Sequence, residues 1–136
     1  GTGSVYQTAI LAQLCRRGVS IERLGSLASS AQSVLADIGI SNVEFHVGDG
    51  TLGWPELAPY GGIIVTAAAP RVPQALYEQL TEMGRMVIPV GDLTSQELQL
   101  VIRTREGPAV RDFCPCRFVR LIGADGWPDE SDLDND

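Results

Sequence analysis

The sequence contains no lysine, so all ten of its basic side chains are arginines. A Walker-A phosphate loop and any Schiff-base mechanism, including one with pyridoxal phosphate, need a lysine amine and are therefore excluded. The sequence also has only one histidine, His46, which cannot build a histidine-based metal centre alone. We interpret His46 as a structural residue of a strand, and we predict no metal site.

Cysteine is scarce as well, with Cys15, Cys114 and Cys116 as the only three. They lack the Cys-x-x-Cys spacing of a zinc centre, and the Cys-Pro-Cys sequence is too tight for an ordinary disulfide. This pattern predicts reduced thiols in a cytosol. The chain has no run of 18 apolar residues and no basic segment followed by an apolar one. We therefore expect a soluble, cytoplasmic protein with neither a membrane span nor a secretory signal.

Negative charge is concentrated at one end of the chain. The 136 residues suffice for one compact domain, and their formal net charge is -7. Six of the 17 acidic residues lie from Asp125 onward without any base, which leaves 11 acids against ten arginines before them. We therefore predict a nearly neutral domain over residues 1–123 and an acidic, disordered tail over residues 124–136. The domain is not basic enough to bind nucleic acid.

Helical and extended patterns alternate along the chain. Helices are predicted at 6–17, at 24–38 and from Pro73 to near Gly84, and strands at 19–22, 43–47, 62–66 and 85–90. Two further extended runs, at 97–105 and 112–122, predict an antiparallel pair. This order indicates a Rossmann-like α/β fold whose sheet is mostly parallel, with antiparallel strands at the C-terminal end.

The carboxyl ends of the predicted parallel strands are where such sheets bind ligands. The opening Gly1-Thr2-Gly3-Ser4 precedes a helix, and Glu22 follows Gly3 by 19 positions, a spacing at which an acidic residue accepts hydrogen bonds from ribose hydroxyls. Tyr6 stands where a dinucleotide fingerprint has its third glycine, so S-adenosylmethionine, which has no phosphate, fits better than a dinucleotide. Structural alternatives stay open, because Asp49 also suits a turn and Glu22 a helix start.

Seven segments of the chain together carry a more specific pattern. They are Gly-Thr-Gly-Ser-Val-Tyr-Gln-Thr-Ala (1–9), Ile-Glu-Arg (21–23), Gly-Asp-Gly-x-x-Gly-Trp-Pro-Glu (48–56), Ala-Pro-Tyr-Gly-Gly-Ile-Ile-Val-Thr-Ala-Ala-Ala-Pro (58–70), Val-Pro-Gln-Ala-Leu (72–76), Val-Ile-Pro-Val-Gly (87–91) and Arg-Phe-Val-x-Leu-x-Gly (117–123). In this order the chain resembles protein-L-isoaspartate O-methyltransferases from residue 1 to about residue 127. The segments at 48–56 and 65–70 are typical of that family rather than of methyltransferases at large.

The resemblance implies methyl transfer from S-adenosylmethionine to the α-carboxylate of L-isoaspartyl and D-aspartyl residues in damaged proteins, a repair reaction. Isoaspartyl proteins or peptides would be the partners, and the complete protein would be a monomer. The implied cofactor-binding residues are Gly1, Thr2, Gly3, Ser4, Glu22, Asp49, Gly50, Thr66, Ala67 and Gln96. Among these, Glu22 would hold the ribose hydroxyls, Asp49 and Gly50 would face the adenine, and Gln96 would lie near the substrate carboxylate.

The chain also departs from the family pattern. It has Val5 in place of a glycine, Gly61 in place of an aspartate and Arg120 in place of a proline. It begins inside the cofactor loop, so the first central strand and the upstream segment with the catalytic serine are missing from it. We therefore expect no catalytic residue here, unpaired edges on the strands at 19–22 and 62–66, and a destabilised, inactive chain.

Two other functions stay open at this stage. One is a non-catalytic domain that binds an adenine nucleoside or a partner that completes the sheet. The other is a short dinucleotide oxidoreductase domain, which would prefer NAD over S-adenosylhomocysteine.

Overall fold

The computed structural model describes residues 1–2 and 5–133 and divides the chain into two compact units, Gly1–Gly50 and Thr51–Asp136. Each unit has its own β-sheet and its own cluster of buried apolar side chains. The sequence analysis expected one domain with a single core. The division falls within the loop that carries the Gly-Asp-Gly-x-x-Gly-Trp-Pro-Glu segment.

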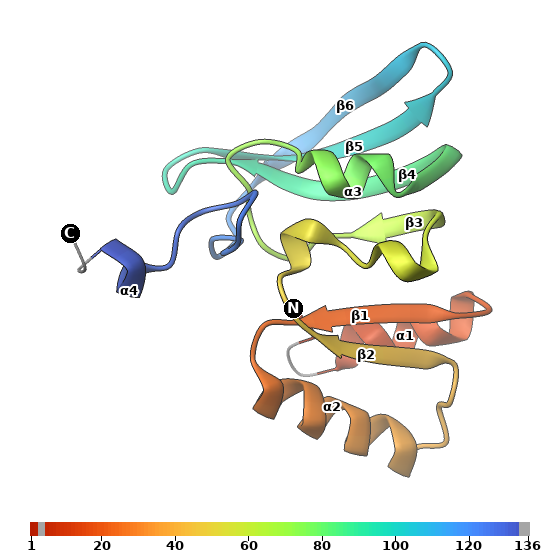
Figure 1. Ribbon diagram of the computed structural model, residues 1–136. Coiled ribbons are helices and arrows are strands. Elements are labelled where there is room, and N and C mark those ends of the chain that lie inside the picture. Colours follow the sequence, from red (N-terminus) through yellow and green to blue (C-terminus); the bar gives the residue numbers. More distant parts are fainter. Residues whose placement is uncertain (3–4, 134–136) are drawn as a thin grey trace. The chain divides into compact units, whose positions relative to one another are not determined.

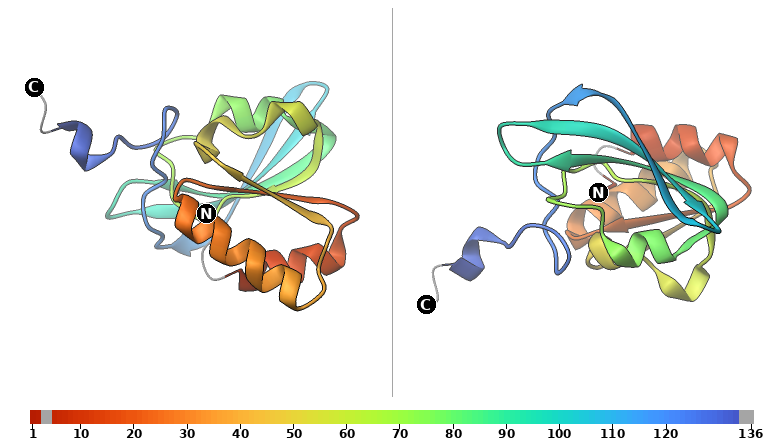
Figure 2. Two further views of the ribbon diagram at one scale, coloured as in Figure 1. Left: turned by 60° about the horizontal axis from the view of Figure 1, so that its bottom comes forward. Right: turned by 90° about the horizontal axis from the view of Figure 1, so that it is seen from above.

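The first unit consists of two helices packed on a two-stranded parallel sheet (Figure 1). Its elements are α1 (Tyr6–Leu14), β1 (Gly18–Glu22), α2 (Gly25–Asp37) and β2 (Val43–Val47). Val43 and Phe45 alternate along β2 and therefore point to the same face, where they pack with Leu35 of α2 and Ala9 of α1. Both helices thus cover one face of this sheet, as the two views in Figure 2 show.

Val5, at the start of α1, combines a strained backbone with a buried side chain. Its φ of 70° is left-handed, a conformation that a β-branched residue rarely adopts. Its side chain is only 6% exposed and packs against Ala31 and Leu35. Val5 thus combines a strained backbone with a buried apolar side chain, and we expect this burial to compensate for part of the strain.

The second unit is built on a four-stranded mixed sheet in the order β3-β4-β5-β6. Its elements are η1 (Gly50–Leu52), η2 (Pro55–Leu57), β3 (Tyr60–Ile64), α3 (Gln74–Glu78), β4 (Leu80–Gly91), β5 (Gln96–Thr104), β6 (Gly107–Cys116) and α4 (Glu130–Leu133). β3 and β4 are parallel, whereas β4-β5 and β5-β6 are antiparallel, as the sequence predicted for the C-terminal strands. α3 contributes Leu76 to a core that contains Met86 and Ile88 of β4 (Figures 1 and 2).

Four predicted elements of this unit were placed wrongly. β3 spans 60–64 rather than 62–66, and the predicted helix from Pro73 to Gly84 ends at Glu78. Leu80 begins β4 instead. An apolar residue at this position fits a helical and an extended pattern equally well, and the pairing of Leu80 with Tyr60 favours the strand. β6 spans 107–116 rather than 112–122, because the turn after Thr104 starts the hairpin earlier.

The boundary of the predicted acidic tail also shifts. Trp127 donates through its indole nitrogen to the Ala68 carbonyl (3.0 Å) and through its backbone nitrogen to the Leu121 carbonyl (2.8 Å). Asp125 accepts from Arg71 (2.6 Å) and from the Gln74 backbone nitrogen at the start of α3 (2.9 Å). Folded structure therefore continues past residue 123 to at least Trp127. The composition of this segment did not predict this, because it does not show which residues these side chains contact.

β1 and β3 are among the strands that keep an unpaired edge, as expected from the sequence for these two. Within residues 1–2 and 5–133, β1 pairs only with β2, and β3 pairs only with β4. The second edge of each strand presents backbone groups that no described strand satisfies, which is the usual liability of an edge strand.

Met83 is a second residue with a left-handed backbone, with a φ of 62°. Because Met83 is 60% exposed, burial of its side chain compensates little for the strained backbone. We expect Met83→Gly to raise the free energy of unfolding by about 1 kcal/mol, since glycine adopts this conformation without steric cost. Urea denaturation of both proteins would measure the change.

The neighbouring Glu82→Gly variant is the control for Met83→Gly. Glu82 is also exposed but has no positive φ, and it forms a surface ion pair with Arg105 (2.6 Å), so glycine there should lower stability by about 0.5–2 kcal/mol. Equal destabilisation by both variants would contradict the assigned strain at Met83.

Candidate functional site

In the first unit, the predicted cofactor residues gather at one end of the sheet. β1 and β2 are parallel, and Glu22 is the register partner of Val47, so both strands end at the same edge. Asp49 and Gly50 follow β2 there, and the Gly48 backbone nitrogen donates to the Glu22 carbonyl (3.0 Å). Gly3 and Ser4, also predicted to bind the cofactor, lie outside the described residues.

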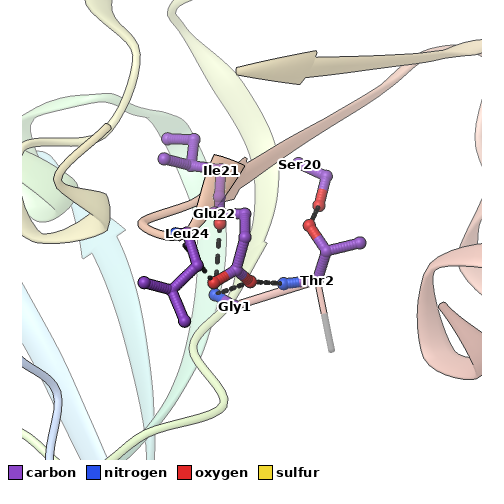
Figure 3. Close-up of polar contacts among 6 residues, drawn as sticks. All are labelled: Gly1, Thr2, Ser20, Ile21, Glu22 and Leu24. Carbon is purple, nitrogen blue, oxygen red and sulfur yellow. Dashed lines mark hydrogen bonds and ion pairs between the residues drawn. The ribbon is translucent and has the colours of Figure 1, made fainter. Parts of the chain in front are cut away.

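The Glu22 carboxylate is the centre of this group (Figure 3). It is buried, with the residue 6% exposed, and it accepts hydrogen bonds from the backbone nitrogens of Thr2 (2.5 Å) and Leu24 (3.3 Å). The terminal amino group of Gly1 lies 4.0 Å from one carboxylate oxygen and donates to the Ile21 carbonyl (3.1 Å). A carboxylate can accept about four hydrogen bonds, so Glu22 retains capacity for further donors.

The segment that contains Thr2 is held in place by a second contact. The hydroxyl oxygens of Thr2 and Ser20 lie 2.7 Å apart, and Thr2 is buried (Figure 3). Thr2 therefore joins the end of the chain to β1 through its side chain and to Glu22 through its backbone. This positions the carboxylate as a rigid acceptor.

In the second unit, Thr66, Ala67 and Gln96 also share one edge of the sheet. Thr66 and Ala67 follow β3, and Ala69 next to them bridges to Val90 near the end of β4. Gln96 begins β5, which is antiparallel to β4 and is paired with Gly91 at this point. Thr66 and Ala67, predicted from the carboxyl-end rule, and Gln96, implied by the family resemblance, thus lie at the same end of the sheet within the second unit.

Gln96 holds two backbone segments in place. The residue is 5% exposed, and its Nε2 donates to the carbonyls of Asp92 (3.0 Å) and Phe118 (3.1 Å), while its Oε1 accepts from the Phe118 nitrogen (2.7 Å). Both amide protons are therefore used, and one lone pair of Oε1 is left for a ligand. The side chain is primarily a clamp between the 92–95 turn and the segment after β6.

Asp92 orders the turn that leads to Gln96. One oxygen of its carboxylate accepts from the Thr94 hydroxyl, the Thr94 nitrogen and the Ser95 nitrogen, each at 2.8 Å. These hydrogen bonds, led by the Thr94 hydroxyl, hold the pKa of Asp92 below its ordinary value. The turn is accordingly stabilised above the unfolded pKa of the carboxyl and loses that stabilisation as the pH falls through the lowered value.

A second buried glutamine, Gln79, fixes the loop that continues from Asp49 and Gly50. Its Oε1 accepts from the Trp54 nitrogen and its Nε2 donates to the Leu52 carbonyl, both at 2.9 Å. The Tyr60 hydroxyl donates to the Trp54 carbonyl (2.5 Å). Sequence analysis did not single out Gln79. Gln79 directly follows Glu78, so the sequence around it contains no pattern that marks a buried amide.

No three histidine, cysteine or acidic side chains among the described residues are grouped so that they could hold a metal ion. Among the helices of the described part of the chain, none combines the length and the apolar character that crossing a membrane requires.

Solved structures define the class of protein to which this fold belongs. The chain matches a structure named protein-L-isoaspartate O-methyltransferase with a TM-score of 0.85 and 30% identity, over 93% of this chain and 41% of that one. A putative protein-L-isoaspartate O-methyltransferase from Plasmodium falciparum, solved with S-adenosyl-L-homocysteine, matches with a TM-score of 0.75 and 22% identity, over 90% and 63% of the two chains. The fold is thus that of the α/β methyltransferases.

Sequence comparison narrows the class to one family. The sequence model of protein-L-isoaspartate(D-aspartate) O-methyltransferase matches residues 1–126. The protein-L-isoaspartate O-methyltransferase of Magnetococcus marinus is 52% identical over 128 residues, which are 93% of this chain and 56% of that protein. The chain therefore belongs to the protein-L-isoaspartate(D-aspartate) O-methyltransferase family. It spans about 56–61% of the length of the curated relatives that it matches.

Proposed function

We propose that this chain supplies the cofactor-binding part of an enzyme that methylates the α-carboxylate of L-isoaspartyl and D-aspartyl residues in damaged proteins, with S-adenosylmethionine as methyl donor. The family match over residues 1–126 supports the reaction. The observation that carries the proposal is the buried Glu22 carboxylate at the carboxyl ends of β1 and β2. Isoaspartyl proteins of the cytoplasm would be the substrates, and the complete enzyme would act as a monomer.

The donor and acceptor groups of the first unit suit a nucleoside. Ribose presents hydroxyl donors, and Glu22 is a charged acceptor whose position is fixed by the Thr2 and Leu24 nitrogens. Asp49 and Gly50 lie at the same end of the sheet, where they would face the adenine. Within the second unit, Thr66, Ala67 and Gln96 are the residues that the family resemblance assigns to the cofactor, and they lie together at one end of that unit's sheet.

The reaction requires no acid, base or nucleophile from the side chains. S-adenosylmethionine supplies an activated methyl group when bound. The substrate carboxylate has an ordinary pKa near 4, so it is already the nucleophilic form at neutral pH and needs no general base. The residues of the site act by holding the two reactants in line, which is catalysis by proximity and orientation. A sequence without lysine is compatible with this chemistry.

Calorimetric titration of S-adenosylhomocysteine into the 136-residue chain tests the proposal. We expect micromolar binding, about -8 kcal/mol. Glu22→Gln removes the charge but keeps the shape of the side chain, so hydrogen bonds to a charged acceptor become hydrogen bonds to a neutral amide. We expect this to cost about 2 kcal/mol, roughly a 30-fold weaker affinity.

Glu44→Gln is the matched control for Glu22→Gln. Glu44 lies near the start of β2 and is exposed, paired with Arg17 at 2.6 Å, so its replacement should leave the affinity unchanged. Equal affinity of the Glu22→Gln and wild-type chains would contradict the assigned role of Glu22. Binding of S-adenosylhomocysteine by a protein that does not methylate an isoaspartyl peptide would favour the alternative of a non-catalytic nucleoside-binding domain.

A further inference from the structure

Strand β6 carries two cysteines that the proposed methyl transfer does not use. Within the described part of the chain, β6 pairs only with β5 and forms an edge of the four-stranded sheet. Both thiols are free, with Cys114 exposed and Cys116 half-buried. Cys116 is the register partner of Gln96 and Cys114 that of Leu98. Two residues apart on one strand, the cysteines project from the same face.

The strand geometry keeps these two thiols from forming a disulfide with each other. Alternate side chains of a strand start about 6.6 Å apart. The Cβ atoms of a disulfide lie about 3.5–4.5 Å apart, so closure would require the strand to buckle. Pro115 between the cysteines fixes its own φ and resists that change. The two sulfurs therefore remain as a pair of thiols above one patch of the sheet.

The spacing suits one ion placed between the sulfurs. With metal–sulfur bonds of about 2.3 Å, a linear two-coordinate ion holds its sulfurs about 4.6 Å apart. Two thiols that start about 6.6 Å apart at their Cβ atoms reach this distance by leaning toward each other. A structural zinc ion needs four ligands, whereas no third histidine, cysteine or acidic side chain joins this pair among the described residues.

We propose that Cys114 and Cys116 form a binding site for one soft, thiophilic monovalent ion, with Cu(I) as its representative. Thiolate ligands select such ions over hard ones. Binding forms two metal–sulfur bonds, breaks two S–H bonds and releases both protons to solvent, without any change of oxidation state. The product is a bis-thiolate complex with one net negative charge.

The local structure supports the site in one further way. A shift of register between Leu98 and Gln99 leaves Phe113 as an extra residue in β6, immediately before Cys114. Such bulges redirect the side chains next to them.

Anaerobic titration of the reduced chain with Cu(I), in competition with a chromophoric Cu(I) chelator, tests the proposal. We expect one ion per chain for the wild type and for Cys15→Ser, in which only the third cysteine is lost. Cys114→Ser and Cys116→Ser should each weaken the affinity at least 100-fold. Because both sites are on an exposed edge strand, each variant should keep the melting temperature of the wild type.

Three results would overturn the proposal. The first is equal Cu(I) binding by the Cys114→Ser/Cys116→Ser double variant. The second is a stoichiometry of one ion per two chains, which would indicate a site between copies. The third is tighter binding of Zn²⁺ alone than of Cu(I), which would contradict the two-coordinate geometry.

Discussion

Replacing Gly53 with alanine is expected to lower the free energy of unfolding of the second unit by about 3 kcal/mol. Gly53 has a φ of 63°, and a Cβ atom there would lie 2.2 Å from Oε1 of Gln79. The Gln79 amide cannot move aside without losing its hydrogen bonds to the Trp54 nitrogen and the Leu52 carbonyl. The left-handed backbone costs about 1 kcal/mol, and breaking buried hydrogen bonds costs about 1–3 kcal/mol each. Urea denaturation would measure the loss.

Gly61→Ala is the matched control for Gly53→Ala. A Cβ atom at Gly61 meets nothing within 4 Å, and its φ is not positive, so alanine should be neutral there or slightly stabilising. The double variant Gly53→Ala/Gln79→Ala isolates the clash. Its destabilisation should be smaller than the sum of the two single effects, because the second substitution removes the atoms that the first one strikes. Strict additivity would show that the two residues do not interact.

Truncation of the chain after Gly123 is expected to destabilise the second unit by about 3 kcal/mol or more. It removes Trp127, with its indole hydrogen bond to the Ala68 carbonyl, and Asp125, which joins Arg71 and the start of α3. Loss of a packed tryptophan typically costs about 3–5 kcal/mol, and Trp127 is half-buried, so the lower end applies. Thermal melting and urea denaturation of the two chains would measure this.

Truncation after Pro128 provides the comparison. It removes most of the acidic segment but keeps Asp125 and Trp127. It breaks the ion pair between Arg120 and Glu130, whose carboxylate is exposed, so the loss should stay below about 1 kcal/mol. If both truncated chains melted like the full chain, the folded part would end at residue 123, as composition alone suggests.

The parts of the fold that sequence predicted well are those in which a local pattern has a single solution. Strand β2 was predicted at its observed bounds, because Val43–Val47 is bounded by a turn on each side. The start of β4 was not predicted, because Leu80 suits a helix as well as a strand. Its pairing with Tyr60, 20 positions away, makes it part of a strand. Distant pairing cannot be inferred from a short apolar pattern.

The candidate site likewise contains features that the sequence predicts and features that it does not. The rule that ligands bind at the carboxyl ends of parallel strands predicted Glu22 and Asp49 at such ends, and in the structure they follow the adjacent parallel strands β1 and β2. Gln96 was assigned only through the family resemblance. The rule says nothing of what a buried amide contacts. Gln96 and Gln79 hold backbone segments more than 20 residues away, and these partners are set by tertiary structure. The sequence predicted which strand ends carry the candidate site, but not which side chains hold its loops in place.

The two separate cores have a consequence for how the chain loses its structure. Among the described residues of the first unit, the buried cluster consists of Val5, Ala31 and Leu35 against a sheet of two strands, whereas the second unit buries a larger cluster against four strands. Two-stranded sheets are marginal by themselves, and cooperative units within one protein open with different free energies. We therefore expect the amide hydrogens of β1 and β2 to exchange with solvent through a lower-energy opening than those of β4 and β5. Glu22 belongs to the less stable unit, so a nucleoside that binds it as proposed would stabilise the part of the chain that we expect to open first.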